Sequence, residues 1–265
     1  MNDTWILSPP AGGLTEGEGI PSCVPLVPHT GYVPGVGTQA GILPKKAGSR
    51  PSAKKDPAFL KDTRFAIWRD GATHIISESY FYKTEPYYTI LQHELEGKPV
   101  RPASSAVLDA YVVPVCLERS RHFGIPVCNW EISQGYTPLP SILYGLNYFA
   151  NTSDYVVVSD NEKAKETIRH ITNKGKYPFC YQKLPDNATI RSCISVFGKT
   201  TTASDPIDTI ASQVYDLFAI PLVTIVMVQD SDGFRLSSLS PTKYSQLAGA
   251  ERSLLSAYIS HQEFL

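Results

Sequence analysis

The stretch that decides the fold is "YDLFAIPLVTIVMVQDSDGFRLSSLSP", residues 215–241. It contains an apolar, β-branched run at residues 222–228, the turn sequence "DSDG" at residues 230–233, and a second run that ends in "LSSLS" at residues 236–240. β-branched and apolar residues favour strands, and an Asp-Gly pair favours a tight turn between strands. This stretch therefore predicts a β-hairpin, and the segments around it indicate which fold contains that hairpin.

Patterns on either side of the hairpin predict an α/β (α+β) protein with antiparallel or mixed sheets and with helices on one face. Apolar residues three and four positions apart predict helices, and short apolar runs bounded by Gly, Pro or Asp predict strands. Helices are expected at residues 85–98, 105–124 with a break near Pro114, 161–175, 205–219 and 240–261. Further strands are expected at residues 64–70, 73–81, 125–132, 154–160, 177–185 and 189–200.

Single residues mark the expected ends of these helices. Ser105 and Asp160 stand where a side chain can cap a helix N-terminus. Gly97, Gly124 and Gly175 follow helical segments, where glycine commonly ends a helix. The helices and strands are expected to share one core that contains Phe179, Tyr181, Ile190, Ile194, Val196, Leu222, Val223, Ile225 and Leu236.

The N-terminal region differs from the rest of the chain in composition. Residues 1–60 contain nine Pro and nine Gly and keep neither a helical nor an alternating pattern. Such a segment cannot bury enough apolar area to fold alone. Large apolar side chains are nevertheless scattered through it, which predicts an extended arm that docks on other protein subunits. The candidate partner-binding residues of this arm are Trp5, Leu7, Leu26, Val27, Tyr32 and Ile42.

Charge and cysteine usage limit the classes of partner and compartment. The formal net charge is −1, so no global basic field favours nucleic acid. The basic cluster at residues 45–55 is interpreted as a solvated linker or as a contact with an acidic partner. The sequence contains no run of about 18 apolar residues, so no membrane span is predicted. Five Cys without a CxxC spacing predict buried free thiols in a reducing compartment, either a virion or the host cytoplasm.

Three segments follow one another in an order that is typical of one superfamily. "LEGKPVRPASSAVLDAYVVPVCLERSRHFGIPV" spans residues 95–127, "CYQKLPDNATIRSCISVFGKT" spans residues 180–200, and the hairpin stretch spans residues 215–241. Together they resemble the ATP-grasp superfamily, especially ligases of the ribosomal-protein-S6-modifying type. The resemblance implies an ATP-grasp-like fold, with an N-terminal α/β domain at residues 61–130 and a truncated ATP-grasp-like domain at residues 131–265.

The resemblance also implies which positions would carry the family's chemistry. In that family a hinge acid or amide binds adenine, and an arginine stabilises the charge of the phosphate and the acyl phosphate. An aspartate, a glutamate and an asparagine hold Mg²⁺, which prefers hard oxygen ligands. The matching positions are Gln182 in the hinge, Arg191 in the next strand, and Val226, Ser238 and Ser240 for the three metal ligands.

The sequence departs from the family at most of these positions. None of the three metal positions carries the family's residue, Lys183 replaces the acid after Gln182, and Thr189 replaces the acid before Arg191. The family also has a small subdomain with a phosphate-binding lysine and a Gly-rich loop. In its place "TPLPSILYGLNYFANTS", residues 137–153, contains no lysine and no GxxG. A metal site without its ligands is therefore expected, and only Gln182 and Arg191 are candidate nucleotide contacts.

These observations predict a non-catalytic ATP-grasp-like protein without a cofactor or metal. Its expected role is that of a structural subunit of a large assembly, as the head, neck or tail component of a virus or phage particle or as a ribosome-associated subunit. The alternative is an active ATP-dependent carboxylate–amine ligase with relocated ligands. A third possibility is a protein that binds a nucleotide without magnesium. The number of acids that converge near Arg191 discriminates between the first two functions.

Overall fold

The computed structural model describes residues 59, 61, 63–147, 155–202 and 204–260. These residues belong to one compact unit, Ala53–Leu265. The predicted arm lies outside them apart from Phe59, so its six candidate partner-binding residues lie outside them too. The described residues combine helices with antiparallel and mixed sheets, which confirms the expected α+β class. No helix among them is long and apolar enough to cross a membrane.

The first sheet is small and contains the strands β1 (Phe65–Arg69), β2 (Ala72–Ile76) and β3 (Val100–Arg101). β1 and β2 are antiparallel, whereas β2 and β3 are parallel. Asp70 and Gly71 connect β1 to β2 with φ angles of 49° and 74°. Positive φ at both central residues is the requirement of a type I′ turn, which explains the Asp-Gly pair here.

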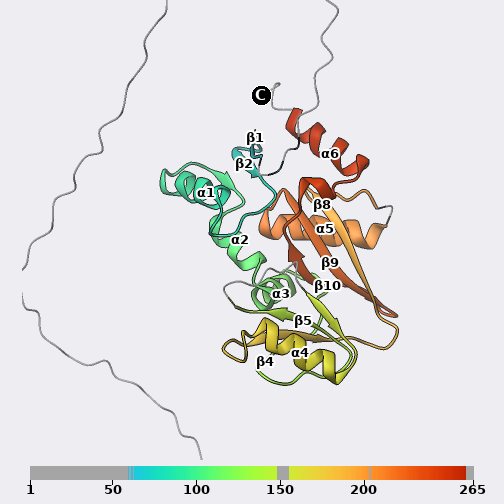
Figure 1. Ribbon diagram of the computed structural model, residues 1–265. Helices are drawn as coiled ribbons and strands as arrows, with labels where there is room; N and C mark the ends of the chain where they lie inside the picture. Colours follow the sequence, from blue (N-terminus) through green and yellow to red (C-terminus); the bar gives the residue numbers. More distant parts are fainter. Residues whose placement is uncertain (1–58, 60, 62, 148–154, 203, 261–265) are drawn as a thin grey trace, which may run out of the picture. The chain divides into compact units, whose positions relative to one another are not determined.

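Three helices follow this hairpin (Figure 1), namely α1 (Glu85–Leu95), α2 (Ser104–Ala110) and α3 (Val113–His122). The predicted break near Pro114 is confirmed, because α2 and α3 are separate helices and the proline stands in the first turn of α3. The predicted cap Ser105 is wrong. Ala103 occupies the N-cap position of α2, and Ser105 already lies inside the helix.

The second sheet has the strand order β4-β7-β5-β6, formed by β4 (Glu131–Ser133), β7 (Phe179–Lys183), β5 (Ser141–Gly145) and β6 (Val156–Val158). Helix α4 (Asn161–Ile171) packs on one face of it (Figure 1). The Asp160 side chain accepts a hydrogen bond of 2.8 Å from the Lys163 amide, which confirms the predicted N-cap. Thr172, rather than Gly175, is the C-cap residue of α4.

The third sheet contains the predicted hairpin and has the order β10-β9-β8, with β8 (Thr189–Val196), β9 (Leu222–Asp230) and β10 (Gly233–Ser240). Helix α5 (Asp205–Phe218) packs on one face (Figure 1). The 3₁₀ helix η1 (Tyr244–Gln246) and α6 (Gly249–Ser260) replace the single closing helix expected at residues 240–261. Because α6 packs at the other face of this sheet, the expectation of helices on one face alone is wrong.

The apolar interior is divided into three clusters rather than one common core. The largest lies between α2, α3, α5 and the adjoining faces of the second and third sheets. A second joins the first sheet to β8, β9 and α6, and contains Ile194, Val196 and Leu222. A third joins α4 to β5–β7 and contains Phe179 and Tyr181. Contacts also cross the predicted domain boundary at residue 130, since the Cys128 amide donates to the Leu236 carbonyl at 2.9 Å.

Leu222 tests the second cluster, because its side chain is 0% exposed. Replacing Leu222 with Ala removes buried methyl groups and leaves a cavity, so we expect the free energy of unfolding to fall by about 2–5 kcal/mol. The matched control is Leu95→Ala, whose side chain is 80% exposed. Urea denaturation measures both changes. A loss below about 0.5 kcal/mol for Leu222→Ala would contradict the placement of β9.

Candidate functional site

The three positions where the resemblance places metal ligands lie side by side on one face of the third sheet. Val226 of β9 is paired with Ser238 of β10, and the next pair on that face is Thr224 with Ser240. Directly paired residues of antiparallel strands point to the same face. Val226, Ser238 and Ser240 are all buried. The three positions therefore present one hydrocarbon side chain and two neutral hydroxyls, where Mg²⁺ chemistry needs negatively charged and amide oxygens.

A buried hydrogen-bond network joins the second and third sheets beside these positions. It depends on a β-bulge, because the pairing of β9 with β10 skips Ser237 between Leu236 and Ser238. Ser237 Oγ lies 2.7 Å from the hydroxyl of Tyr144 in β5 and 2.6 Å from Oε1 of Gln182 in β7. The amide of Gln182 also donates from Nε2 to the Ser237 carbonyl at 2.8 Å.

The pattern of partners fixes the direction of each hydrogen bond in this network. The carbonyl of Ser237 can only accept, so the nitrogen of the Gln182 amide must face it, and Oε1 must face the Ser237 hydroxyl. A serine hydroxyl has one proton, and Ser237 donates it to Gln182. The hydroxyl of Tyr144 must then donate to Ser237 Oγ. The contact joins the side chains of Tyr144, Gln182 and Ser237 with the backbone carbonyl of Ser237, so it connects β5 and β7 to β10.

The titratable groups around this network are hydroxyls and thiols, and burial makes their ionisation still less favourable. Tyr144 is almost completely buried, which raises the pKa of its hydroxyl well above the ordinary tyrosine value. Burial likewise raises the pKa of Cys128 and of Cys180 to about 12. Cys116, Cys128, Cys180 and Cys193 are all free, as the sequence predicts. At neutral pH the junction of the two sheets therefore carries hydroxyl, thiol and amide groups without a charge.

The structure does not bring the two candidate nucleotide contacts together. Gln182 is buried in the network described above. Arg191 is exposed on β8, where it is paired with Met227 and so lies on the opposite face from Val226. Among the residues that the structure describes, no carboxylate forms an ion pair with Arg191. The roles predicted for Gln182 and Arg191 stay predictions, but the two side chains do not share a site.

The acidic turn of the hairpin has a structural partner. Arg235 donates from Nη1 to Asp230 at 2.6 Å and from Nη2 to Asp232 at 2.8 Å. Both carboxylates of the "DSDG" turn therefore balance one guanidinium instead of facing outward as a pair. Within the described ranges, no group of three or more His, Cys, Asp or Glu is arranged to hold a metal ion.

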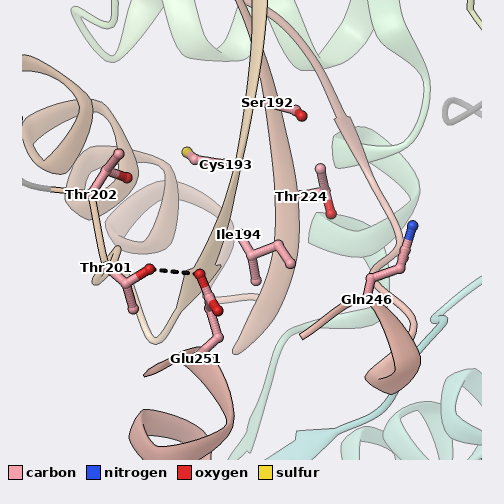
Figure 2. Close-up of a pocket in the computed structure, with 8 residues that line it drawn as sticks. All are labelled: Ser192, Cys193, Ile194, Thr201, Thr202, Thr224, Gln246 and Glu251. Carbon is pink, nitrogen blue, oxygen red and sulfur yellow. Dashed lines mark hydrogen bonds between the residues drawn. The ribbon is translucent and has the colours of Figure 1, made fainter. Parts of the chain in front are cut away.

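A polar pocket of about 380 Å³ opens along β8, next to the predicted metal positions. Ser192 and Thr224 reach it from the face that also carries Val226 and Ser240, to which they are paired. In Figure 2, Thr201 and Glu251 meet at one end of the pocket, and Thr201 donates to Glu251 Oε1 at 2.6 Å. The polar side chains that line it are Ser192, Thr201, Thr202, Thr224, Gln246 and Glu251.

The sequence analysis missed β5, which contains Tyr144, and it missed the role of Ser237 in β10. β5 is a central strand with buried Ile142, Leu143 and Tyr144. The signal was present, because this short apolar run stands between Pro140 and Gly145. Ser237 gave no such signal, since nothing in "LSSLS" shows which serine occupies a bulge.

Comparisons with known proteins find similarity in structure alone. No family model and no curated protein matches the sequence. The structure is similar to that of an ATP-grasp RimK domain protein from Sphaerobacter thermophilus, at 12% identity and a TM-score of 0.48, over 65% of this chain and 77% of that one.

Two ligases are further examples of this likeness. The ATP-grasp ligase PsnB in complex with a minimal precursor is 15% identical, with a TM-score of 0.44, over 65% of this chain and 68% of that one. The D-alanine–D-alanine ligase from Helicobacter pylori is 8% identical, with a TM-score of 0.49, over 66% of this chain and 65% of that one. At these identities the likeness concerns the fold and not the activity.

Ser237 tests the network between the sheets. We expect Ser237→Ala to lower the free energy of unfolding by about 1–3 kcal/mol, because it leaves the buried Tyr144 and Gln182 groups unpaired. Tyr144→Phe removes a single bond and should cost about 0.5–1.5 kcal/mol. Urea denaturation of both single variants and the double variant gives their coupling energy. Tyr136→Phe is the matched control, since Tyr136 is 71% exposed; additive effects of Ser237→Ala and Tyr144→Phe would contradict the network.

Proposed function

We propose that this chain is a non-catalytic ATP-grasp-like protein that acts as a structural subunit of a larger assembly. The observation that carries the proposal is the state of the three predicted metal positions. Val226, Ser238 and Ser240 lie together on one face and are buried, next to the hydrogen-bonded contact between β7 and β10. These positions contribute to the protein interior, and they supply neither the charge nor the open coordination that a metal–nucleotide site needs.

Electrostatics supports the same proposal. A site for Mg·ATP balances the phosphate charge with metal and cationic groups that are fixed before the substrate arrives. Here the groups at the junction of the two sheets are hydroxyls and thiols, which are neutral at pH 7, and burial raises the pKa values of Tyr144, Cys128 and Cys180 further. The one predicted cation, Arg191, lies on the opposite face from Val226. Among the described residues, neither a group of metal ligands nor this arginine therefore adjoins Val226 on its face of the sheet.

The proposed role in an assembly rests on the composition of residues 1–60. Ordering a backbone costs roughly 1–2 kcal/mol per residue, and proline lowers that cost by restricting the unfolded chain. Large apolar side chains can offset part of it when a neighbouring subunit buries them. We propose that neighbouring subunits bury six such side chains of the arm, namely Trp5, Leu7, Leu26, Val27, Tyr32 and Ile42. A head, neck or tail component of a virus or phage particle is the most specific form of this proposal.

Titration with Mg·ATP tests the non-catalytic proposal. We expect no heat in calorimetry and no change in melting temperature at about 1 mM Mg·ATP. A site with a dissociation constant near 1 μM would at this concentration stabilise the protein by about 4 kcal/mol, which shifts the melting temperature by roughly 8–16 °C. The control is an active ATP-grasp ligase measured in the same buffer.

The alternatives give different results in the same experiment. A micromolar dissociation constant together with phosphate release in the presence of amine acceptors would contradict the proposal in favour of a carboxylate–amine ligase. Binding of ATP that persists in excess EDTA would instead indicate a nucleotide-binding protein without magnesium.

Photo-cross-linking tests the proposed arm in the full-length chain. We expect benzoylphenylalanine in place of Trp5 or Tyr32 to form adducts with other subunits of the native assembly, because both side chains are proposed to be buried against them. The control position is Tyr88, an exposed residue of α1. Mass spectrometry identifies each adduct. Adducts at Tyr88 but none at Trp5 or Tyr32 would contradict the proposed role of the arm.

A further inference from the structure

β8 is an edge strand whose outer side is open over part of its length. The third sheet ends with β8, and no other strand among the described residues pairs with its outer side. The amide and carbonyl of Val196 bond to Lys199 at 2.9 and 3.0 Å, so the backbone of Val196 points away from β9. Backbone direction alternates along an antiparallel strand, so Ile194, Ser192 and Ile190 also point their amides and carbonyls outward.

The polar pocket straddles this edge. Ser192 and Cys193 project to opposite sides of the same strand in Figure 2, and both line the pocket. Side chains on both sides of the strand therefore border one space of about 380 Å³. A segment that lay along β8 would place its backbone against the outward amides and one side chain in this space.

Glu251 gives the pocket its chemical character. One carboxylate oxygen, Oε1, accepts the hydrogen bond from Thr201 at 2.6 Å, which orients the side chain. The other, Oε2, is buried and has no hydrogen-bond partner among the described residues. No Lys, Arg or His lines the pocket. A buried carboxylate oxygen without a partner is unfavourable, and a cationic donor stabilises it most strongly.

We propose that the open edge of β8 binds an extended segment of a partner protein as an added strand, with a lysine or arginine side chain of that segment in the pocket against Glu251. Backbone hydrogen bonds to Ser192 and Ile194 would give the affinity, and the pocket would select the side chain. The volume suits one long basic side chain, whose ammonium or guanidinium group donates to Glu251 Oε2 and to the neighbouring hydroxyls.

This contact surface goes beyond the proposed function, because it involves no residue of the N-terminal arm and needs no nucleotide. It also differs from the predicted metal positions, since the proposed contact is made by β8 and by Glu251 of α6. Failure of the peptide to bind would therefore contradict this contact alone. The Mg·ATP titration and the cross-linking of the arm test the proposed function independently.

The probe is an end-capped seven-residue peptide that alternates valine and threonine around a central lysine. We expect calorimetry to detect its binding, and NMR to detect shifts of the β8 amides. Replacing the central lysine with glutamine, or Glu251 with Gln, should weaken binding about ten- to a hundredfold, because each removes one charge-assisted hydrogen bond. Glu162→Gln is the matched control, since Glu162 is an exposed acid in the first turn of α4.

Two further variants separate the strand from the side chain. N-methylation of alternate peptide amides should abolish binding, and N-acetyl-lysine amide alone should bind at least a hundredfold more weakly than the peptide, because each lacks the backbone ladder. Thr201→Val should weaken binding severalfold through the loss of the bond that orients Glu251. The proposal is overturned if the peptide does not bind at millimolar concentration. Equal affinity for the lysine and glutamine peptides, equal affinity of the N-methylated peptide, or no effect of Glu251→Gln would also overturn it.

Discussion

The hydroxyl of Ser237 is the interaction on which the junction of the two larger sheets depends. β5 and β7 present Tyr144 and Gln182 toward β10, and both side chains carry polar groups into a buried space. Each group needs a partner there, because an unpaired buried donor or acceptor costs about 1–3 kcal/mol. One serine satisfies both groups and fixes their orientations. The bulge in β10 is required for this, since regular pairing has no place for the extra residue.

This constraint explains how much of the fold the sequence could predict. Local signals were sufficient where one element decides its own ends, as with the Asp160 cap and the turn at residues 230–233. Local signals failed where contacts with a neighbouring element determine where a helix begins. Ser105 is a good capping residue, but α2 begins one residue earlier, at Ser104, which is held by hydrogen bonds from its amide and hydroxyl to Glu94 of α1. The strand β5 has only five residues, and its side chains are buried on both faces. It therefore lacks the alternation of polar and apolar residues that would have distinguished it from a loop.

The candidate site was predictable in a different sense. Order and spacing of short segments led to the prediction that Val226, Ser238 and Ser240 occupy the metal positions. The structure shows these three residues side by side, and their assignment stays a prediction. The face on which Arg191 lies was not predictable, because the register of β8 against β9 decides it and a shift of one residue would reverse it. The network around Ser237 was not predictable either. It joins residues that are 93 and 55 positions apart, so no local pattern contains them.

The third sheet is covered by other segments at its β10 edge and open at its β8 edge. The outer side of β10 is covered, because the Cys128 amide donates to the Leu236 carbonyl and the Leu236 amide donates to Pro126. This places β10 inside the structure and lets its bulge face β5 and β7.

The other edge, formed by β8, has no such cover in the described part of the chain. An open edge exposes unpaired amides and carbonyls, and a charged side chain such as Arg191 discourages indiscriminate pairing there. The neighbouring pocket adds a requirement for positive charge, because Glu251 has one carboxylate oxygen left to pair. The two charges thus act at different registers. Arg191 disfavours a basic residue beside it, whereas the pocket favours a basic side chain at the register that reaches Glu251.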